Sequence, residues 1–596
     1  MVALRKHAPA LVAAVLTCAA LAGAVPAAAG GEQQTSKVVV TTTDDAAAAH
    51  VGEELRQHGA RNMRPLNVVH GFSAEVPARY VAQLRREPGV RSVTVDRTVK
   101  LLTAEPGLDA NNFNSLAGIA RVTSASDAWN AGITGKGVDV ALIDSGVVPV
   151  QGLTSGNVVN GPDLSFESQS KDLRTLDTFG HGTHMASIIS GRDAAGSGTQ
   201  YASDTTSFKG IAPDARTVSV KVADHSGATD VSQVIAAIDW VVENAKTNGM
   251  NIRVMNLSFG TDSTQWYAID PLCFAVENAW RNGIAVVVAG GNDGTAKERL
   301  ANPAQDPYVI AVGAEDPRGT RQVQDDVVPA FSSRGSATRY VDLVAPGVSV
   351  HGLRAPGSWI DQNYPAAQAG ARFFKGSGTS QAAAVVSGAA ALLLQRYPNL
   401  TPDQVKAHLM GTATAFSGST QRQRGAGVIN MKKALNTAPP TAAAATQAHG
   451  AGAGTGSLEA ARGSYHIGDE NSLLTGEKDI FGNAFDSASW AAATATGTAW
   501  NAGTWMGTVW TGDGFNSTDW TGAAWSGAAW SGAAWSGAAW SDAGWEGHAW
   551  SGAAWSGAAW SGSAWSGAAW SGAAWSGAAW SGAGWSTGAW SSAAWQ

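Results

Sequence analysis

VDVALIDSG at residues 138–146 is an apolar run that stops at an acidic turn. Its valines and isoleucine favour a strand, and an apolar run without polar alternation indicates a strand buried on both faces. Segments of the same two kinds recur, strands at 217–220, 252–257 and 284–289 and helices at 231–244 and 271–281. Apolar strands separated by helices predict an α/β domain whose parallel sheet is covered by helices on both faces.

Three polar motifs stand where these elements end or begin. Asp144-Ser145-Gly146 closes the first strand, HGTHMA opens a helix at residue 181, and GSGTS opens a helix predicted over 381–395. In an open parallel sheet, strand ends and helix starts meet at one crevice. Acyl transfer by a hydroxyl needs an imidazole to take its proton and a carboxylate to orient that imidazole. The motifs contain one of each, so together they predict a nucleophilic hydrolase.

Each motif alone also fits a purely structural role. Asp-Ser-Gly is a common turn, Gly-Thr-Ser occurs as a helix cap, and paired histidines occur as metal ligands. The histidine pair lacks a nearby third ligand, however, and a serine at a helix N-terminus has backbone N–H groups beside its developing oxyanion. The order and placement of the three motifs therefore favour catalysis.

Over residues 110–436 the chain resembles the subtilisin-like serine peptidases, the subtilase family, through these three motifs. The resemblance implies a subtilisin-like fold and an Asp-His-Ser triad. In that triad Asp144 would orient the imidazole, His181 would be the general base and acid, and Ser380 would be the nucleophile. His184, the second histidine of its motif, would be structural.

The resemblance also assigns residues around the triad. Asn292, within GGNDG, would donate a hydrogen bond to the oxyanion. Ser258, Phe259 and Gly260 would pair with the substrate backbone, and Gly290 would also contact the substrate. Two later segments match the family as well, FSSRG at 331–335 and VAPG at 344–347.

Two features depart from the family pattern. After Ser380, QAAA at 381–384 stands in place of Met-Ala-Ser-Pro, which changes the packing below the nucleophile but removes no reacting group. Residues 191–209 have the character of an insertion. The resemblance implies no cofactor for catalysis, and whether a structural calcium ion binds stays open.

Two segments precede the peptidase domain. Residues 1–29 have a basic start, a short apolar stretch and an Ala-rich end, which favours a cleaved secretory signal peptide over a membrane anchor. Residues 30–105 predict the β-α-β-β-α-β order of a ferredoxin-like sandwich. The predicted elements lie at 37–41, 46–58, 66–76, 77–87 and 90–95. The resemblance implies that this unit is a propeptide, an intramolecular inhibitor and folding partner.

After the peptidase domain, expected over 106–438, the composition changes twice. Residues 439–489 are rich in Ala and Gly and predict a linker, whereas 490–596 carry a tryptophan at almost every fifth position and no Lys or Arg. A period of five keeps neither one helix face nor one strand face, which favours a disordered tail over a small-residue solenoid. Its rings predict contact with cell wall or polysaccharide.

Charge and cysteine content exclude several classes of protein. With 40 Lys+Arg against 47 Asp+Glu the net charge is −7, so a basic surface that binds nucleic acid is excluded. The two cysteines, Cys18 and Cys273, exclude a disulfide framework, an iron–sulfur cluster and a cysteine zinc knuckle. Cys18 lies in the signal peptide, and Cys273 is expected to be a buried thiol.

The sequence therefore predicts a secreted, extracellular serine endopeptidase that forms an acyl-enzyme with protein and peptide substrates. It is expected to be a self-processing precursor without a transmembrane span in the mature chain. An acid-active serine-carboxyl peptidase would need a glutamate where His181 stands. The alternative is an adhesion protein that acts through the tryptophan-rich tail and uses the folded domain as a scaffold.

Overall fold

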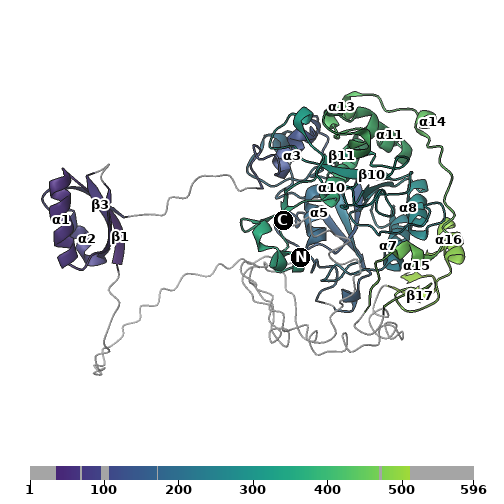
Figure 1. The fold of residues 1–596 in the computed structure, drawn as a ribbon, viewed down its shortest axis with the longest axis horizontal. Coiled ribbons are helices and arrows are strands. Elements are labelled where there is room, and N and C mark those ends of the chain that lie inside the picture. The colour runs from purple at the N-terminus through teal and green to yellow at the C-terminus, as the bar shows by residue number, and fades with distance from the viewer. Residues whose placement is uncertain are drawn as a thin grey trace, which may run out of the picture. The chain divides into compact units, whose positions relative to one another are not determined.

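The computed structural model describes residues 35–66, 70–95, 107–170, 172–196, 198–468, 473–501 and 503–510. The signal peptide predicted at 1–29 and the tail beyond Trp510 lie outside the described residues. The chain divides into two compact units, one ending at Leu102 and the other beginning at Thr103 (Figure 1). Among the described residues, no helix is long and apolar enough to cross a membrane.

The first unit has the predicted β-α-β-β-α-β order. Its elements are β1 (Thr35–Thr42), α1 (Asp45–Gln57), β2 (Arg61–Leu66), β3 (Gly71–Pro77), a 3-10 turn (Ala78–Tyr80), α2 (Val81–Leu84) and β4 (Val90–Val95). The sheet is antiparallel, with strand order β2-β3-β1-β4. Apolar residues of β1, α1 and β3 form its small core, among them Val38, Leu55 and Phe72. The ferredoxin-like fold follows from that order and pairing.

The second unit is built on a seven-stranded sheet whose strand pairs are all parallel, as predicted. The strands are β5 (Asp139–Asp144), β6 (Val158–Asp163), β7 (Arg216–Lys221), β8 (Ile252–Leu257), β9 (Ala285–Ala289), β10 (Ile310–Glu315) and β11 (Leu343–Pro346). Their order is β11-β10-β9-β8-β5-β7-β6. Three of them, β6, β10 and β11, extend the sheet beyond the four strands that the sequence predicts.

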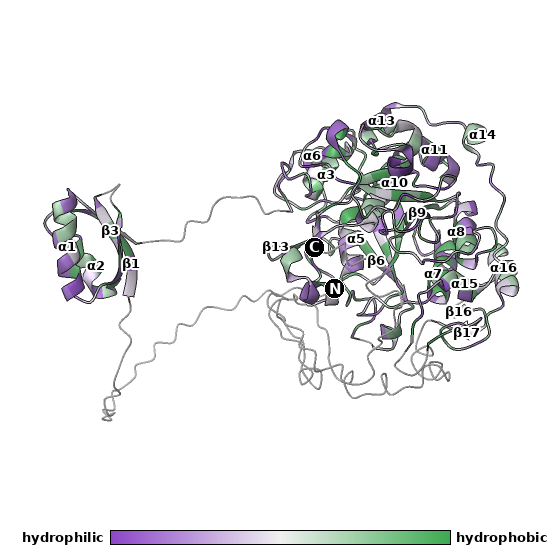
Figure 2. Cartoon of the chain, in the orientation of Figure 1, coloured by the Kyte–Doolittle hydropathy of each residue, from purple (hydrophilic) through white to green (hydrophobic). Residues whose placement is uncertain are grey.

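Two pairs of helices pack against this sheet. The first pair is α5 (His181–Ser190) with α10 (Thr379–Arg396), and the second is α7 (Val231–Asn244) with α8 (Pro271–Arg281). Every residue of α10 from Thr379 to Leu394 is buried, because alanine and other small residues let the helix lie directly on the strands. Hydrophobic residues accordingly concentrate in the strands and in α5 and α10 (Figure 2).

Shorter elements surround this core. The helices are α3 (Leu116–Val122), α4 (Ala125–Asn130), α6 (Gly198–Ser203), α9 (Trp359–Asn363), α11 (Pro402–Thr412), α12 (Gln421–Arg424) and α13 (Met431–Asn436), with short 3-10 turns at Phe166–Gln169, Val323–Asp325 and Pro365–Ala367. A small antiparallel sheet has the order β12 (Val350–Leu353), β14 (Phe373–Gly376), β13 (Gln368–Ala369). Cys273 lies on α8 as a buried free thiol, and burial raises its pKa well above the usual value.

The linker prediction for 439–489 is wrong, because this segment contains helices that pack on α11, α7 and α8. It contains α14 (Ala442–Ala445) and α15 (Leu458–Arg462), and it is followed by α16 (Ser487–Ala495) and the strands β15 (Trp500–Asn501), β16 (Thr504–Trp505) and β17 (Thr508–Val509). Apolar side chains spaced among the alanines and glycines are buried, at Leu458, Ile467, Leu474, Ile480, Phe481 and Phe485. Arg462 also forms a buried ion pair with Asp230, the N-cap of α7, with Nε 2.6 Å from Oδ2.

The first tryptophans of the predicted tail belong to the same folded unit. Trp490 and Trp505 donate their indole N–H groups to the buried carboxylate of Asp239 on α7, at 2.9 and 2.8 Å, and Thr494 donates its hydroxyl. Trp510 packs edge-to-face on Trp505 with ring centroids 5.2 Å apart. Burial raises the pKa of Asp239 to about 6. The folded unit therefore continues past residue 490, where the sequence predicts the start of the tail.

We predict that Asp239→Ala lowers the free energy of unfolding of the second unit by at least about 2 kcal/mol, because it leaves two buried indole N–H groups without an acceptor. Glu243→Ala, which removes an exposed acid from the same helix, is the matched control and should change it by less than about 0.5 kcal/mol. Urea unfolding followed by tryptophan fluorescence measures both. Equal effects of the two substitutions would contradict the anchoring role of Asp239.

Candidate active site

Asp144 and His181 form a buried pair where a strand ends and a helix begins. Asp144 is the last residue of β5, and His181 is the first residue of α5. Nδ1 of His181 lies 2.9 and 3.0 Å from the two carboxylate oxygens of Asp144. The exposed fractions of the two residues are 0% and 1%, so their hydrogen bond is shielded from water. This hydrogen bond fixes the orientation of the imidazole through Nδ1, and Nε2 lies on the opposite side of the ring.

Ser380 is the second residue of α10, and its hydroxyl is also buried. Oγ donates a hydrogen bond to the carbonyl oxygen of Ser258 at 2.8 Å, and Oγ of Ser258 donates to the carbonyl of Ser380 at 3.2 Å. Ser258 directly follows β8. Gly378 has no side chain that could cap α10, and the backbone N–H of Thr379 in the first turn donates to Asn292 instead.

Asn292 lies beside the start of α10. Its Oδ1 accepts hydrogen bonds from the backbone N–H of Thr379 at 2.9 Å and from the Thr379 hydroxyl at 3.1 Å. Because Oδ1 is the acceptor, the amide group Nδ2 serves as the donor. A Cβ at Gly378 would lie 2.9 Å from Oε1 of Gln381, which would have to shift, and 3.4 Å from Nδ2 of Asn292, which is ordinary contact.

The four residues assigned to substrate binding lie on two neighbouring segments. Phe259 is buried, whereas Gly260 and Gly290 lie on either side of the loop that carries Ala301. A Cβ at Gly260 would stand 2.8 Å from Cβ of Ala301, and Ala301 donates its backbone N–H to Gly290 at 3.0 Å. Ser258 links Ser380 to this segment through the hydrogen bonds described above.

His184 lies apart from the Asp144–His181 pair, one turn further along α5. Its Nε2 is 3.2 Å from the carbonyl oxygen of Val350 and 3.1 Å from that of Phe374. Burial lowers the pKa of His184 to about 3, so the ring is neutral. It packs α5 against the small sheet, which agrees with the structural role expected for it.

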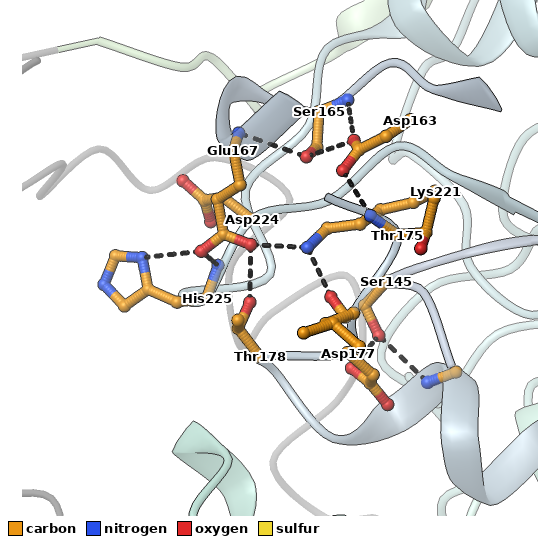
Figure 3. A network of polar contacts seen from close by, with 12 residues as sticks. Ser145, Asp163, Ser165, Glu167, Thr175, Asp177, Thr178, Lys221, Asp224 and His225 are labelled. Carbon is orange, nitrogen blue, oxygen red and sulfur yellow. Dashed lines mark hydrogen bonds and ion pairs between the residues drawn. The ribbon is translucent and has the colours of Figure 1, made fainter. Parts of the chain in front are cut away.

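Three residues near the site carry no role in the sequence analysis. Thr379 donates hydrogen bonds to Asn292. Ser145 donates its hydroxyl to Asp177, which accepts the N–H of Thr183 at the start of α5 (Figure 3). Each stands within four residues of a triad position, and that proximity is the signal that points to them. Within the part of the chain that the structure describes, no group of three or more His, Cys, Asp or Glu is arranged to hold a metal ion.

The chain matches known proteins over the region that carries this site. A family model described as the subtilase family matches residues 135–434. Serine protease AprX of Bacillus subtilis (strain 168) is 33% identical over 392 residues, which cover 64% of this chain and 83% of AprX. Subtilisin Savinase of Lederbergia lenta is 33% identical over 321 residues, which cover 53% of this chain and 97% of Savinase.

One solved structure is also similar. Fervidolysin from Fervidobacterium pennivorans, a keratinolytic enzyme related to subtilisin, aligns with a TM-score of 0.43 at 23% sequence identity. The alignment covers 70% of this chain and 63% of fervidolysin.

Proposed function

Because the chain belongs to the subtilase family and is a serine endopeptidase with the subtilisin-like α/β fold, we propose that Asp144, His181 and Ser380 are its catalytic triad. The observation that carries the proposal is the buried hydrogen bond between Nδ1 of His181 and the carboxylate of Asp144. Ser380 at the N-terminus of α10 supplies the hydroxyl that this pair would activate.

The proposed reaction begins when the Ser380 hydroxyl turns its proton from the carbonyl of Ser258 to Nε2 of His181. Oγ then attacks the carbonyl carbon of the scissile peptide bond, the proton passes to His181, and Asp144 stabilises the imidazolium. His181 next gives that proton to the leaving amine, which yields the acyl-enzyme. Water activated by His181 hydrolyses the ester by the same steps in reverse. This chemistry uses only protein groups and water.

The oxyanion of each tetrahedral intermediate would accept hydrogen bonds from Nδ2 of Asn292 and the backbone N–H of Ser380. The contacts of Asn292 with Thr379 support this role, since they hold the amide in place before the charge develops. Ser258, Phe259 and Gly260, with Gly290, would bind the substrate backbone in an extended conformation alongside Ala301.

The first unit would act as the propeptide, an inhibitor and folding partner of the second unit. The support is its separate small core and its ferredoxin-like fold. A parallel sheet of seven strands has many non-local contacts, and a prefolded partner would accelerate its slow folding. With the signal peptide expected at 1–29, the enzyme would be secreted as a precursor and cut itself between the two units.

We predict that Ser380→Ala accumulates as the full-length precursor, whereas the wild type separates into two fragments that stay associated. The variant should also be inert toward added peptides, because it retains only the residual rate from binding and the oxyanion site. Mass spectrometry of both proteins, expressed in a host without other secreted proteases, measures the outcome. Processing of Ser380→Ala at the wild-type rate would show that another protease makes the cut.

We predict that Asn292→Ala lowers kcat about 10²–10³-fold with little change in KM, because its donor acts on charge that exists mainly in the transition state. Asn436→Ala, an exposed asparagine at the end of α13, is the control and should leave both constants unchanged. Steady-state kinetics on a chromogenic peptide measures them. A wild-type kcat for Asn292→Ala would remove this residue from the oxyanion site.

The tail beyond Trp510 favours an additional binding role for the secreted enzyme. From residue 490 onward only Asp513, Asp519, Asp542 and Glu546 are charged, and exposed indoles stack on sugars. We predict that a chain ending at Trp510 hydrolyses soluble peptides as the full chain does, but is retained less on insoluble polysaccharide or cell-wall material. Equal retention of the two chains would refute the binding role.

A further inference from the structure

Helix α5 begins at His181, yet the residue before it, Gly180, has no side chain that could cap the helix. Two side chains from other segments do so instead. The N–H of Gly182 donates to Oγ of Ser145 at 2.9 Å, and the N–H of Thr183 donates to Oδ2 of Asp177 at 2.7 Å. Capping side chains fix the position of the first helical turn. The place of His181 therefore depends on Ser145 and Asp177.

Ser145 joins the two carboxylates on either side of it. Its Oγ lies 2.8 Å from Oδ1 of Asp177 and 3.2 Å from Oδ1 of Asp144. A hydroxyl has one proton, and the shorter distance assigns that proton to Asp177. The backbone N–H of Ser145 then serves Asp144, at 2.8 Å, beside Nδ1 of His181. Asp177 thus takes the hydroxyl proton of Ser145, and Ser145 serves the catalytic carboxylate of Asp144 with its backbone N–H.

The buried ion pair between Lys221 and Glu167 holds the residues on either side of Asp177, Leu176 and Thr178. Lys221, the last residue of β7, stands beside Asp144 in the sheet register. Its Nζ contacts Oε2 of Glu167 and the carbonyl oxygen of Leu176, each at 2.5 Å. Glu167 in turn accepts the hydroxyl of Thr178 at 2.7 Å (Figure 3). The loop that carries Asp177 is therefore fixed on both sides of that residue.

Every described partner of the Asp177 side chain is a donor. Besides Ser145 and Thr183, the N–H of Gly180 donates to Oδ1 at 2.6 Å. An ionised carboxylate accepts all of these bonds, whereas a protonated one or an amide would place a hydrogen against one of them. Burial raises the pKa of Asp177 to about 6, so at neutral pH the group is the acceptor that its partners need.

We propose that Asp177, acting through Ser145, is a positioning residue that holds the first turn of α5 and the end of β5 at the separation where the Asp144–His181 hydrogen bond forms. The proposal rests on the triad assigned above. We expect Asp177 to affect kcat and not KM, because its described hydrogen bonds go to Ser145 and to the start of α5. None of them reaches the substrate segment Ser258–Gly260. A misplacement of reacting groups by about 1 Å lowers the rate about 10²-fold.

Asp163 offers a matched control. It is a buried carboxylate at the end of β6 that accepts hydrogen bonds from Ser165 and from the backbone N–H of Thr175, in the same network but without a contact to α5 or Ser145. Asp163→Asn and Asp177→Asn therefore impose similar chemical changes on buried acceptors. Of the two substitutions, only Asp177→Asn alters a side chain that caps the helix beginning at His181.

Asp177→Asn should lower kcat about 10²-fold and leave KM within about twofold of the wild type. It should also shift or abolish the downfield proton resonance of Nδ1–H between His181 and Asp144. Asp163→Asn should keep kcat within about threefold and keep that resonance, even where both variants melt at a lower temperature. Ser145→Ala, which removes only the hydroxyl, should lower kcat about tenfold and provides the readout where Asp177→Asn does not fold.

The kinetics and the resonance are measured on the processed wild type and the processed Asp177→Asn and Asp163→Asn variants. The unprocessed Ser380→Ala precursor is the inactive reference. Equal kcat values and an unchanged resonance for Asp177→Asn and Asp163→Asn would overturn the positioning role, provided that the wild type is active and Ser380→Ala is not. Equal activity of the wild type and Ser380→Ala would instead overturn the triad itself.

Discussion

The proposed active site depends on placing a carboxylate and an imidazole together in a buried position. A charged or polar group without partners is costly to bury, so Asp144 needs donors and His181 needs a fixed ring. The structure meets both needs with groups that the fold already brings to the edge of the sheet. Asp144 receives the backbone N–H of Ser145, and the imidazole is directed by the carboxylate itself.

The all-parallel sheet explains why such an arrangement is available. In a parallel sheet the carboxyl ends of neighbouring strands lie along one edge, and the following helices begin there. Asp144 and Lys221 end adjacent strands in register, and Ser258 follows the strand on the other side of β5. Helix α10, buried over almost its whole length, brings Ser380 to the same edge. Ser258 and Ser380, far apart in the sequence, thereby become hydrogen-bonded neighbours.

Buried carboxylates with hydrogen-bond donors also occur on α7 and at its N-cap. Asp239 is buried there with donors from two tryptophans and a threonine, and Asp230 is buried with Arg462. Both carboxylates belong to the peptidase domain. Trp490, Thr494 and Trp505, which bind Asp239, and Arg462, which pairs with Asp230, come from the segment after residue 438. Satisfied buried polar groups specify one arrangement of the chain, because a shifted segment would leave them unpaired. This explains how a segment rich in alanine and glycine keeps a defined path.

Local pattern alone determined the class of the fold, the order of the first unit, four central strands, α7, α8 and most of α10. It also singled out the three motifs that contain Asp144, His181 and Ser380, the residues of the proposed triad. These features follow from apolar runs, helix caps and short motifs, which act between residues close in sequence. The outer strands β6, β10 and β11, the capping of α5 by Ser145 and Asp177, and the docking of residues 439–510 were decided only by tertiary structure. Each rests on contacts between distant segments, such as Asp239 with Trp505, and the energy of a buried hydrogen bond depends on a partner that no local pattern names.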